Sequence, residues 1–257
     1  MKLIYIVFLF SISSTSWAQP KKMMQAMMAA GGACYELDPS WTPQYGAIVA
    51  YWKLNGTGSI AAGASIPATV GTGAVAVNPN ATGMSYASSK LLQGIQFDGV
   101  DDKVCAANDA ALAFGTGDFT FALWLQSTVL GYQNLFSRDD AGSGGGLDFL
   151  VNTGNGVFRT WVGGVAINGN INIATGKWVH VTLARRSGVI YQYVNGNLDI
   201  SAAAAGSITA ASSACMGQYF GGGYPLNGML DDVAVWNVGL TDVQIKMIYD
   251  QQSCGKN

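Results

Sequence analysis

Few residues of this sequence could carry out acid–base catalysis. Of its fifteen acidic residues fourteen are Asp, and Glu36 is the only Glu. Hydrolysis of a glycosidic bond generally uses two carboxyl groups placed on either side of that bond. Neighbouring residues of a strand point to opposite faces, so adjacent acids are poor candidates for such a dyad, and we predict that they are turn or loop acids. The adjacent Asp pairs lie at 101–102, 139–140 and 231–232.

The other familiar catalytic arrangement would be a serine hydrolase, which needs a histidine as general base. His180 is the only histidine, and the sequence contains no Gly-x-Ser-x-Gly motif. Trp178 and Thr182 share the predicted strand face of His180. We therefore predict a structural histidine and no catalytic residues.

Aromatic side chains in glycine-rich or loop segments are candidates for ligand binding. Aromatic rings combine a large apolar face with a polar handle, which suits a weakly charged ligand such as a glycan. Tyr132 and Arg138 are placed in one predicted loop and Trp161 on a predicted strand. The segment YFGGGY carries Tyr219 and Tyr224 on another loop, and loops often carry recognition residues.

The composition excludes several classes of protein. Only 11% of the 257 residues are charged, against about 25% in a typical domain, while 49% are hydrophobic and 34 are Gly. Intrinsic disorder and a coiled coil both require more charge. The net charge of −2 gives no reason to bind nucleic acid or an anionic membrane.

The N-terminus predicts export. Residues 1–18 read as a signal peptide, with Lys2, an apolar run over 3–12 and a small-x-small cleavage site at 16–18. The apolar run is too short to span a membrane, so we expect no span in the mature chain. A lead segment would follow over 19–45, and the protein would be secreted or extracytoplasmic.

Four cysteines lie in the exported part, which predicts two disulfides in an oxidising compartment. Their separations are unlike any compact metal-binding motif. Three pairings are open at this point. The cysteines are Cys34, Cys105, Cys215 and Cys254.

From residue 46 to 252 short strands alternate with Gly and Asn turns, which predicts one all-β sandwich or jelly roll, followed by a tail over 253–257. Asn195-Gly196 predicts a hairpin turn. One helix is predicted to begin after Thr241, with Gln244 completing a capping box and an apolar stripe of Val243, Met247 and Ile248. The predicted strands are 47–54, 74–77, 94–97, 103–107, 119–126, 134–137, 147–152, 156–163, 178–186, 189–194, 198–201, 214–219 and 230–236.

Five segments, taken together and in order, resemble the laminin-G-like jelly rolls, relatives of the concanavalin A-like lectins and glucanases. They span most of the chain after residue 48. They are YWKLNG at 51–56, IQFDGVDDKV at 95–104, FTFALWL at 119–125, GKWVHV at 176–181 with YVNG at 193–196, and NGMLDDVAVWN at 227–237.

This resemblance implies two antiparallel sheets, one of them bent, with the first and last long strands adjacent. It therefore implies the pairings Cys34–Cys254 and Cys105–Cys215. The glycosidases of this fold use a strand motif such as Glu-x-Asp-x-x-Glu, which a chain with Glu36 alone cannot form.

Relatives often bind a structural Ca²⁺ through an acid after the first strand and an acid of the terminal motif. Asp231 would supply the second ligand, but residues 56–62 contain no acid. No cofactor is required, and a structural calcium at Asp231 is an open expectation.

Three hypotheses of function follow. The favoured one is a non-catalytic secreted or cell-surface module that recognises glycan or protein ligands, for example in adhesion. An alternative is an envelope assembly protein whose partner interface includes residues 23–33. The third and weakest is a glycoside hydrolase with an Asp-based site.

Overall fold

The computed structural model describes residues 34–71, 75–77, 82–106, 110–138, 145–209, 213–219 and 221–254. The chain divides into two units, Met1–Ala33 and Cys34–Asn257, and the sandwich belongs to the second. The predicted signal peptide, residues 23–33, Asp139 and Asp140 lie outside the described residues.

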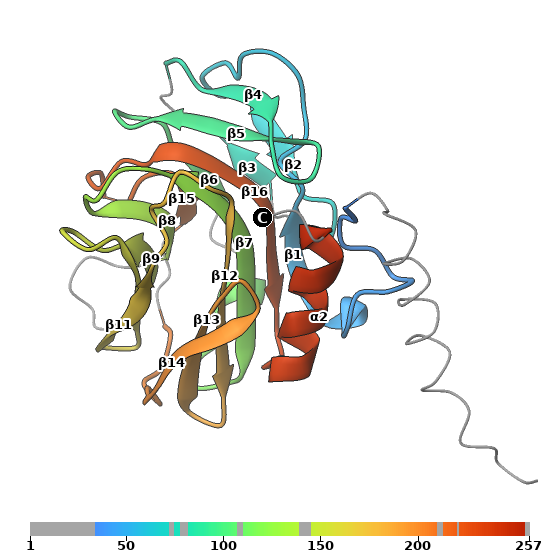
Figure 1. Ribbon diagram of the computed structural model, residues 1–257, viewed down its shortest axis with the longest axis vertical. Helices are drawn as coiled ribbons and strands as arrows, with labels where there is room; N and C mark the ends of the chain where they lie inside the picture. Colours follow the sequence, from blue (N-terminus) through green and yellow to red (C-terminus); the bar gives the residue numbers. More distant parts are fainter. Residues whose placement is uncertain are drawn as a thin grey trace, which may run out of the picture. The chain divides into compact units, whose positions relative to one another are not determined.

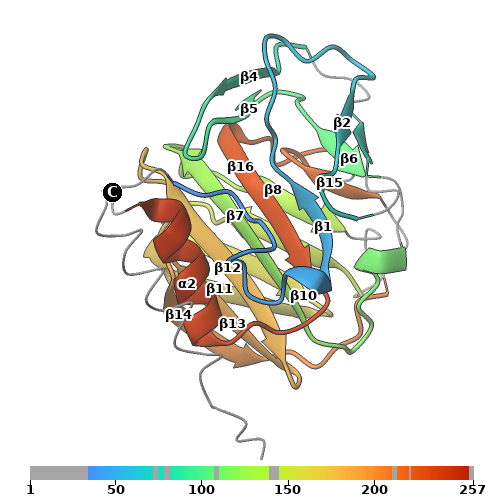
Figure 2. The same ribbon diagram turned by 90° about the vertical axis from the view of Figure 1, so that its right-hand side faces the viewer.

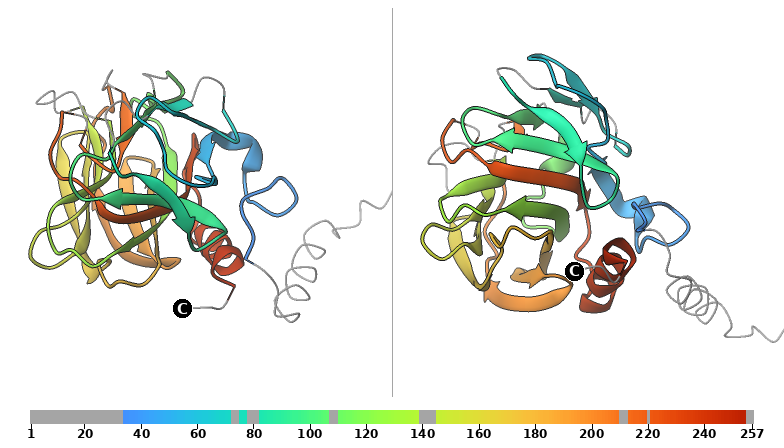
Figure 3. Two further views of the ribbon diagram at one scale, coloured as in Figure 1. Left: turned by 90° about the horizontal axis from the view of Figure 1, so that it is seen from above. Right: turned by 45° about the horizontal axis from the view of Figure 1, so that its top comes forward.

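The second unit consists of two antiparallel sheets of eight strands each. Figures 1 and 3 show how the two sheets face each other. The prediction of an all-β, two-sheet jelly roll is thus confirmed. The first sheet, called sheet A, has the order β14-β13-β12-β7-β16-β5-β4, with β1 also paired to β16. The second, sheet B, has the order β11-β10-β9-β8-β15-β6-β3-β2. The strands are β1 (Ile48–Trp52), β2 (Ser65–Pro67), β3 (Val75–Val77), β4 (Ser85–Ser88), β5 (Gln93–Asp98), β6 (Val104–Ala106), β7 (Phe119–Ser127), β8 (Gln133–Arg138), β9 (Leu147–Val151), β10 (Val157–Val162), β11 (Val165–Asn172), β12 (Val179–Arg186), β13 (Val189–Val194), β14 (Asn197–Ala203), β15 (Ala214–Met216) and β16 (Asn227–Trp236).

Strand β7 shows how the core is built and why the chain has few charges. Its alternating residues Phe121 and Leu123 pack into the main cluster between the sheets. Its other face is also buried, because Ala122 belongs to a second apolar cluster that includes Ile245 of the C-terminal helix. A strand that is buried on both faces has no position for a solvated charge.

The C-terminal helix α2 (Asp242–Ser253) covers the outer face of sheet A, as Figure 2 shows. The predicted capping box between Thr241 and Gln244 is confirmed. The predicted apolar stripe is partly wrong: Val243 is 78% exposed, and Ile245 and Ile248 are the buried residues. The side of α2 that packs on the sheet is formed by Ile245, Ile248 and Gln252, which are spaced three and four residues apart. Val243 does not lie on this side of the helix.

Three strands, β2, β4 and β11, are absent from the predicted set. Strand β11 follows the Gly163-Gly164 turn and lies at the edge of sheet B, where its polar residues remain largely exposed. An exposed edge strand lacks the apolar alternation by which strands are recognised. The hairpin turn at Asn195-Gly196 is confirmed, with both residues at positive φ of 52° and 72°.

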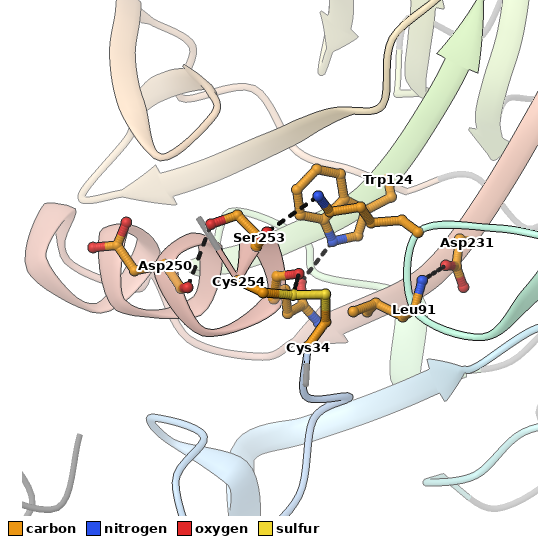
Figure 4. The surroundings of a disulfide bond; sticks show 9 residues. Cys34, Leu91, Trp124, Asp231, Asp250, Ser253 and Cys254 are labelled. Atoms are coloured by element: carbon orange, nitrogen blue, oxygen red, sulfur yellow. Dashed lines mark hydrogen bonds between the residues drawn. A yellow bond between two sulfur atoms is a disulfide. The ribbon is translucent and has the colours of Figure 1, made fainter. Parts of the chain in front are cut away.

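Both expected disulfides are present. Cys34 pairs with Cys254 at the end of α2 (Figure 4), and their Cα atoms are 4.9 Å apart. Cys105 and Cys215 lie directly opposite each other on β6 and β15. The first and last long strands, β1 and β16, are paired, as the resemblance implied.

Candidate functional site

Three of the predicted binding residues come together at one end of sheet B. The ring centroids of Tyr132 and Tyr224 are 5.3 Å apart, and those of Tyr219 and Tyr224 are 6.0 Å apart. Arg159 extends the group, because its Nη1 donates a hydrogen bond of 3.0 Å to the Tyr132 hydroxyl and its guanidinium lies 5.5 Å from that ring centroid. Tyr224 is 46% exposed, so the cluster is open to solvent. We call Tyr132, Arg159, Tyr219 and Tyr224 the tyrosine cluster.

The loop that carries Tyr219 and Tyr224 is held by its own backbone. The Tyr219 N–H donates to the Gly223 carbonyl at 3.1 Å, and the Gly222 N–H donates to the Tyr219 carbonyl at 2.9 Å. Gly222 and Gly223 have φ of 90° and 94°, which only glycine adopts readily. The Tyr224 carbonyl then accepts the Asn134 N–H of β8 at 2.7 Å, which fixes the loop to the sheet.

The outer face of sheet B continues from the tyrosine cluster. Phe158 and Val162 of β10 belong to the core, so the alternating residues Arg159 and Trp161 face outward. Trp161, another predicted binding residue, lies opposite Asp148 of β9 and is partly exposed. Arg159 also offers its guanidinium, whose Nη1 is bonded to Tyr132. The face therefore combines aromatic rings with a few polar groups.

The structure places Arg138 elsewhere, and the predicted loop around it is wrong. Arg138 is the last residue of β8, and it is only 2% exposed. Its partner in the register is Leu147, a core residue, so Arg138 points to the interior rather than toward Tyr132. Arg159 supplies the cation of the cluster instead. Arg159 lies two residues before Trp161 in a predicted strand, so the two side chains share one face. This spacing is the sequence signal that could have identified Arg159.

The adjacent acids Asp231 and Asp232 are not turn acids, which corrects that prediction. Both lie within β16 and are 1% and 2% exposed. A β-bulge interrupts the pairing of β16 with β7 between Asp231 and Ala234, and Asp232 has a φ of 53°. A bulge re-aims side chains locally, so two consecutive residues can both be buried.

Hydrogen-bond donors surround the Asp232 carboxyl. Tyr51 donates its hydroxyl to Oδ1 and Gln252 of α2 donates its amide to Oδ2. Gln252 in turn accepts the indole N–H of Trp124 at 2.9 Å. Burial, together with the nearby charge of Asp231, raises the pKa of Asp232 well above its usual range. This network joins β1, β7, β16 and α2.

Asp231 is the residue expected to bind calcium. Its Oδ2 accepts a hydrogen bond of 2.7 Å from the Ser89 hydroxyl. The same oxygen accepts the Leu91 N–H at 2.9 Å, as Figure 4 shows. Burial raises its pKa to about 7. Glu36, another acid whose charge acts on it, is bound to Lys53 at 2.7 Å. Ca²⁺ requires several converging oxygen ligands, and these acids are engaged by donors instead, so they do not fit a calcium site.

His180 is buried, with 1% exposure, and burial lowers its pKa to about 3. Its ring lies 5.0 Å from the Trp124 ring and 6.1 Å from the Tyr249 ring of α2. The histidine therefore packs as a neutral aromatic side chain beneath the helix.

The chain belongs to the concanavalin A-like lectin/glucanases superfamily, whose sequence profile matches residues 98–246, more than half of the chain. This match confirms the laminin-G-like resemblance of the sequence. A search of curated protein sequences finds no match.

Solved structures share the fold at low sequence identity. Domain 4 of the extracellular GH43 arabinanase AbnA from Geobacillus stearothermophilus, solved in complex with arabinotriose, has a TM-score of 0.55 and 18% identity, covering 67% of this chain and 83% of that domain. The binding domain of Paraclostridial Mosquitocidal Protein 1 has a TM-score of 0.58 and 14% identity, covering 80% of this chain and 52% of the other. Trypanosoma rangeli sialidase has a TM-score of 0.61 and 15% identity, covering 93% of this chain but 39% of the sialidase.

Two observations bear on where the protein resides. Both cysteine pairs are oxidised, which is typical of proteins outside the cytoplasm. In the part of the chain that the structure describes, no helix has the length and hydrophobicity needed to cross a bilayer.

Proposed function

We propose that this protein is a non-catalytic, secreted or cell-surface module that binds glycans at the tyrosine cluster and the adjoining Trp161. One observation carries the proposal: Arg159 and three tyrosine rings form one continuous chain of contacts, from Arg159 through Tyr132 and Tyr224 to Tyr219, and Tyr224 is exposed. Sugar rings present apolar C–H faces and hydroxyl edges. Exposed aromatic rings beside hydroxyl and guanidinium groups can bind both.

The acids support the non-catalytic part of the proposal. A retaining glycosidase holds two carboxyl groups about 5–5.5 Å apart beside the substrate, and an inverting one about 6.5–9.5 Å apart. Asp231 and Asp232 are adjacent, buried and engaged by donors from Ser89, Tyr51 and Gln252. They are therefore inaccessible to a polysaccharide.

The relatives agree with a binding role. The arabinanase domain that shares the fold was solved with arabinotriose, and the toxin structure is a binding domain. Because these structures are less than 25% identical to this chain, the ligand of this chain must be found by experiment.

The test is a glycan array probed with the full exported chain, followed by titration of the best ligand against variants. Tyr224→Ala should weaken binding by about 30-fold, since truncating a central aromatic contact costs about 2 kcal/mol. Leu198→Ala is the matched control, because Leu198 is 49% exposed and lies on β14 of the other sheet.

Three results would count against the proposal. If the folded protein binds no glycan on the array, the proposed class of ligand is wrong. If Tyr224→Ala and Leu198→Ala bind the glycan with equal affinity, the tyrosine cluster is not the binding site. Release of reducing sugar from the bound glycan would overturn the non-catalytic assignment.

A further inference from the structure

A second polar cluster lies in the turn between β5 and β6. Asp98 ends β5, and Asp101 and Asp102 follow in the turn before β6. One carboxylate oxygen from each of the three residues lies within 4.8 Å of the other two. No other group of at least three acid, His or Cys ligand atoms converges in this way among the described residues.

Asp102 distinguishes this cluster from an ordinary group of surface acids. It is only 1% exposed, and its Oδ2 accepts the Asp98 N–H at 2.8 Å. Its other oxygen, Oδ1, is enclosed and has no hydrogen-bond partner among the described residues, and the same holds for Oδ1 of Asp101. A buried carboxylate oxygen without a partner is costly unless a cation or a donor satisfies it.

No basic side chain forms an ion pair with these carboxylates in the described part of the chain. The ion pairs there join other residues, and none involves the three acids. The turn therefore presents concentrated negative charge, part of it enclosed.

From this geometry we propose that Asp98, Asp101 and Asp102 bind a Ca²⁺ ion. Ca²⁺ binds oxygen ligands at about 2.3–2.6 Å, so two ligands of one ion can be up to about 4.6–5.2 Å apart, which accommodates the 4.8 Å spread. Mg²⁺, with bonds of about 2.0–2.1 Å, draws its ligands closer together. Zn²⁺ is disfavoured because the cluster contains neither His nor Cys.

The acidic turn lies beside the base of the loop that carries Tyr219 and Tyr224. A side chain at Gly217, which precedes the loop bearing Tyr219 and Tyr224, would approach the Asp102 carbonyl to 3.0 Å and the Phe97 ring to 2.1 Å. The backbone of the loop base is thus packed directly on the acidic turn. We expect bound Ca²⁺ to order this contact and to strengthen ligand binding, a step that rests on the proposed function.

The experiment measures the metal alone. The full exported chain is dialysed against EDTA, and CaCl₂ is titrated by calorimetry and by thermal unfolding. Extracellular Ca²⁺ modules have a Kd of about 10⁻⁴–10⁻³ M, so about 10 mM CaCl₂ should raise the Tm by about 2–10 °C. MgCl₂ at the same concentration should raise it less.

Asp102→Asn is the decisive variant, with Asp250→Asn as its control because Asp250 forms a partly exposed ion pair with Lys246, far from the turn in sequence. The amide introduced at position 102 retains an acceptor for the Asp98 N–H but has no charge. In EDTA, Asp102→Asn should be at least as stable as the wild type, and it should lose the Tm rise with CaCl₂. Asp250→Asn should keep that rise.

Three outcomes would overturn the site. They are no Ca²⁺-dependent rise in the wild type, an undiminished rise in Asp102→Asn, and a larger rise with MgCl₂ than with CaCl₂. Because no glycan is present, these outcomes are independent of the proposed glycan binding. A glycan affinity that Ca²⁺ leaves unchanged, with Ca²⁺ bound, would refute only the link to the tyrosine cluster.

Discussion

Replacing Asp231 by Asn should stabilise the protein at pH 8 and change its stability little at pH 4. Burial raises the pKa of Asp231 from 3.8 to about 7, although the Ser89 hydroxyl and the Leu91 N–H act in the opposite direction. Between pH 4 and pH 7 the folded state therefore holds a proton on Asp231 that the unfolded state has released. By linkage, this residue makes the stability fall as the pH rises through that window and level off above about pH 7.

The magnitude follows from the two pKa values. A rise from 3.8 to about 7 corresponds to about 4 kcal/mol of lost stability at pH 8. Asn keeps an acceptor oxygen for the donors of Ser89 and Leu91, and it has no charge to desolvate, so Asp231→Asn should recover up to about 4 kcal/mol there. The variant also removes the negative charge that helps to raise the pKa of Asp232, which acts in the same direction.

The assay is urea unfolding of the oxidised protein at pH 4, 5, 6, 7 and 8, with free energies from linear extrapolation. Asp250→Asn is the control, because it removes the same charge from the more exposed side of α2. The difference between Asp231→Asn and the wild type should grow from near zero at pH 4 to its maximum by pH 8. A variant that is less stable than the wild type at pH 8 would refute the reasoning and show that the ionised carboxylate is stabilising.

Three further variants test how the sandwich is held together, each by urea unfolding. Replacing Cys34 and Cys254 together by Ser opens a loop with a sequence separation of 220 and should cost about 5 kcal/mol, and a loss below about 1 kcal/mol would contradict the entropic account. Thr241→Ala removes the N-cap of α2 and should cost about 1 kcal/mol, whereas no loss would show that packing alone fixes the helix start. Trp124→Phe leaves the Gln252 side-chain carbonyl oxygen without its donor at 2.9 Å and should lower the free energy of unfolding by about 1–3 kcal/mol. An unchanged urea midpoint would contradict this expectation.

The parts of the fold that the sequence predicts are those with strong local signals. The apolar alternation of β7 and the positive-φ preference of Asn195-Gly196 both specify local structure directly. The cysteine pairing came from the resemblance, because spacing alone left three pairings open. Strand β11 was not predicted, because its polar sequence has no apolar alternation. It is extended because it pairs with β10, and local sequence does not show this pairing.

The acids show why a rule of alternation can fail. The adjacent Asp pairs were predicted to be turn or loop acids, because neighbouring residues of a strand point to opposite faces. Asp231 and Asp232 instead lie in the predicted strand 230–236, and the bulge before Ala234 lets both be buried. A bulge is set by how β16 meets β7 and α2, which are distant in sequence, so no local pattern announces it. The prediction that Arg138 lies in a binding loop was wrong for a related reason. The direction of its side chain depends on its register with Leu147 of the neighbouring strand.

The scarcity of charge now has a structural explanation that also limits where a ligand can bind. The central strands of sheet A face the core on one side and α2 on the other, and the bond between Cys34 and Cys254 ties the N-terminal segment to that helix. This double burial leaves few positions for charged side chains, and those present, such as Asp231 and Asp232, are buried and hydrogen-bonded; it also covers the outer face of sheet A. The outer face of sheet B has no such cover at Tyr224, which is 46% exposed. Recognition is therefore expected on sheet B, where Tyr224 is exposed and Arg159 lies beside Tyr132.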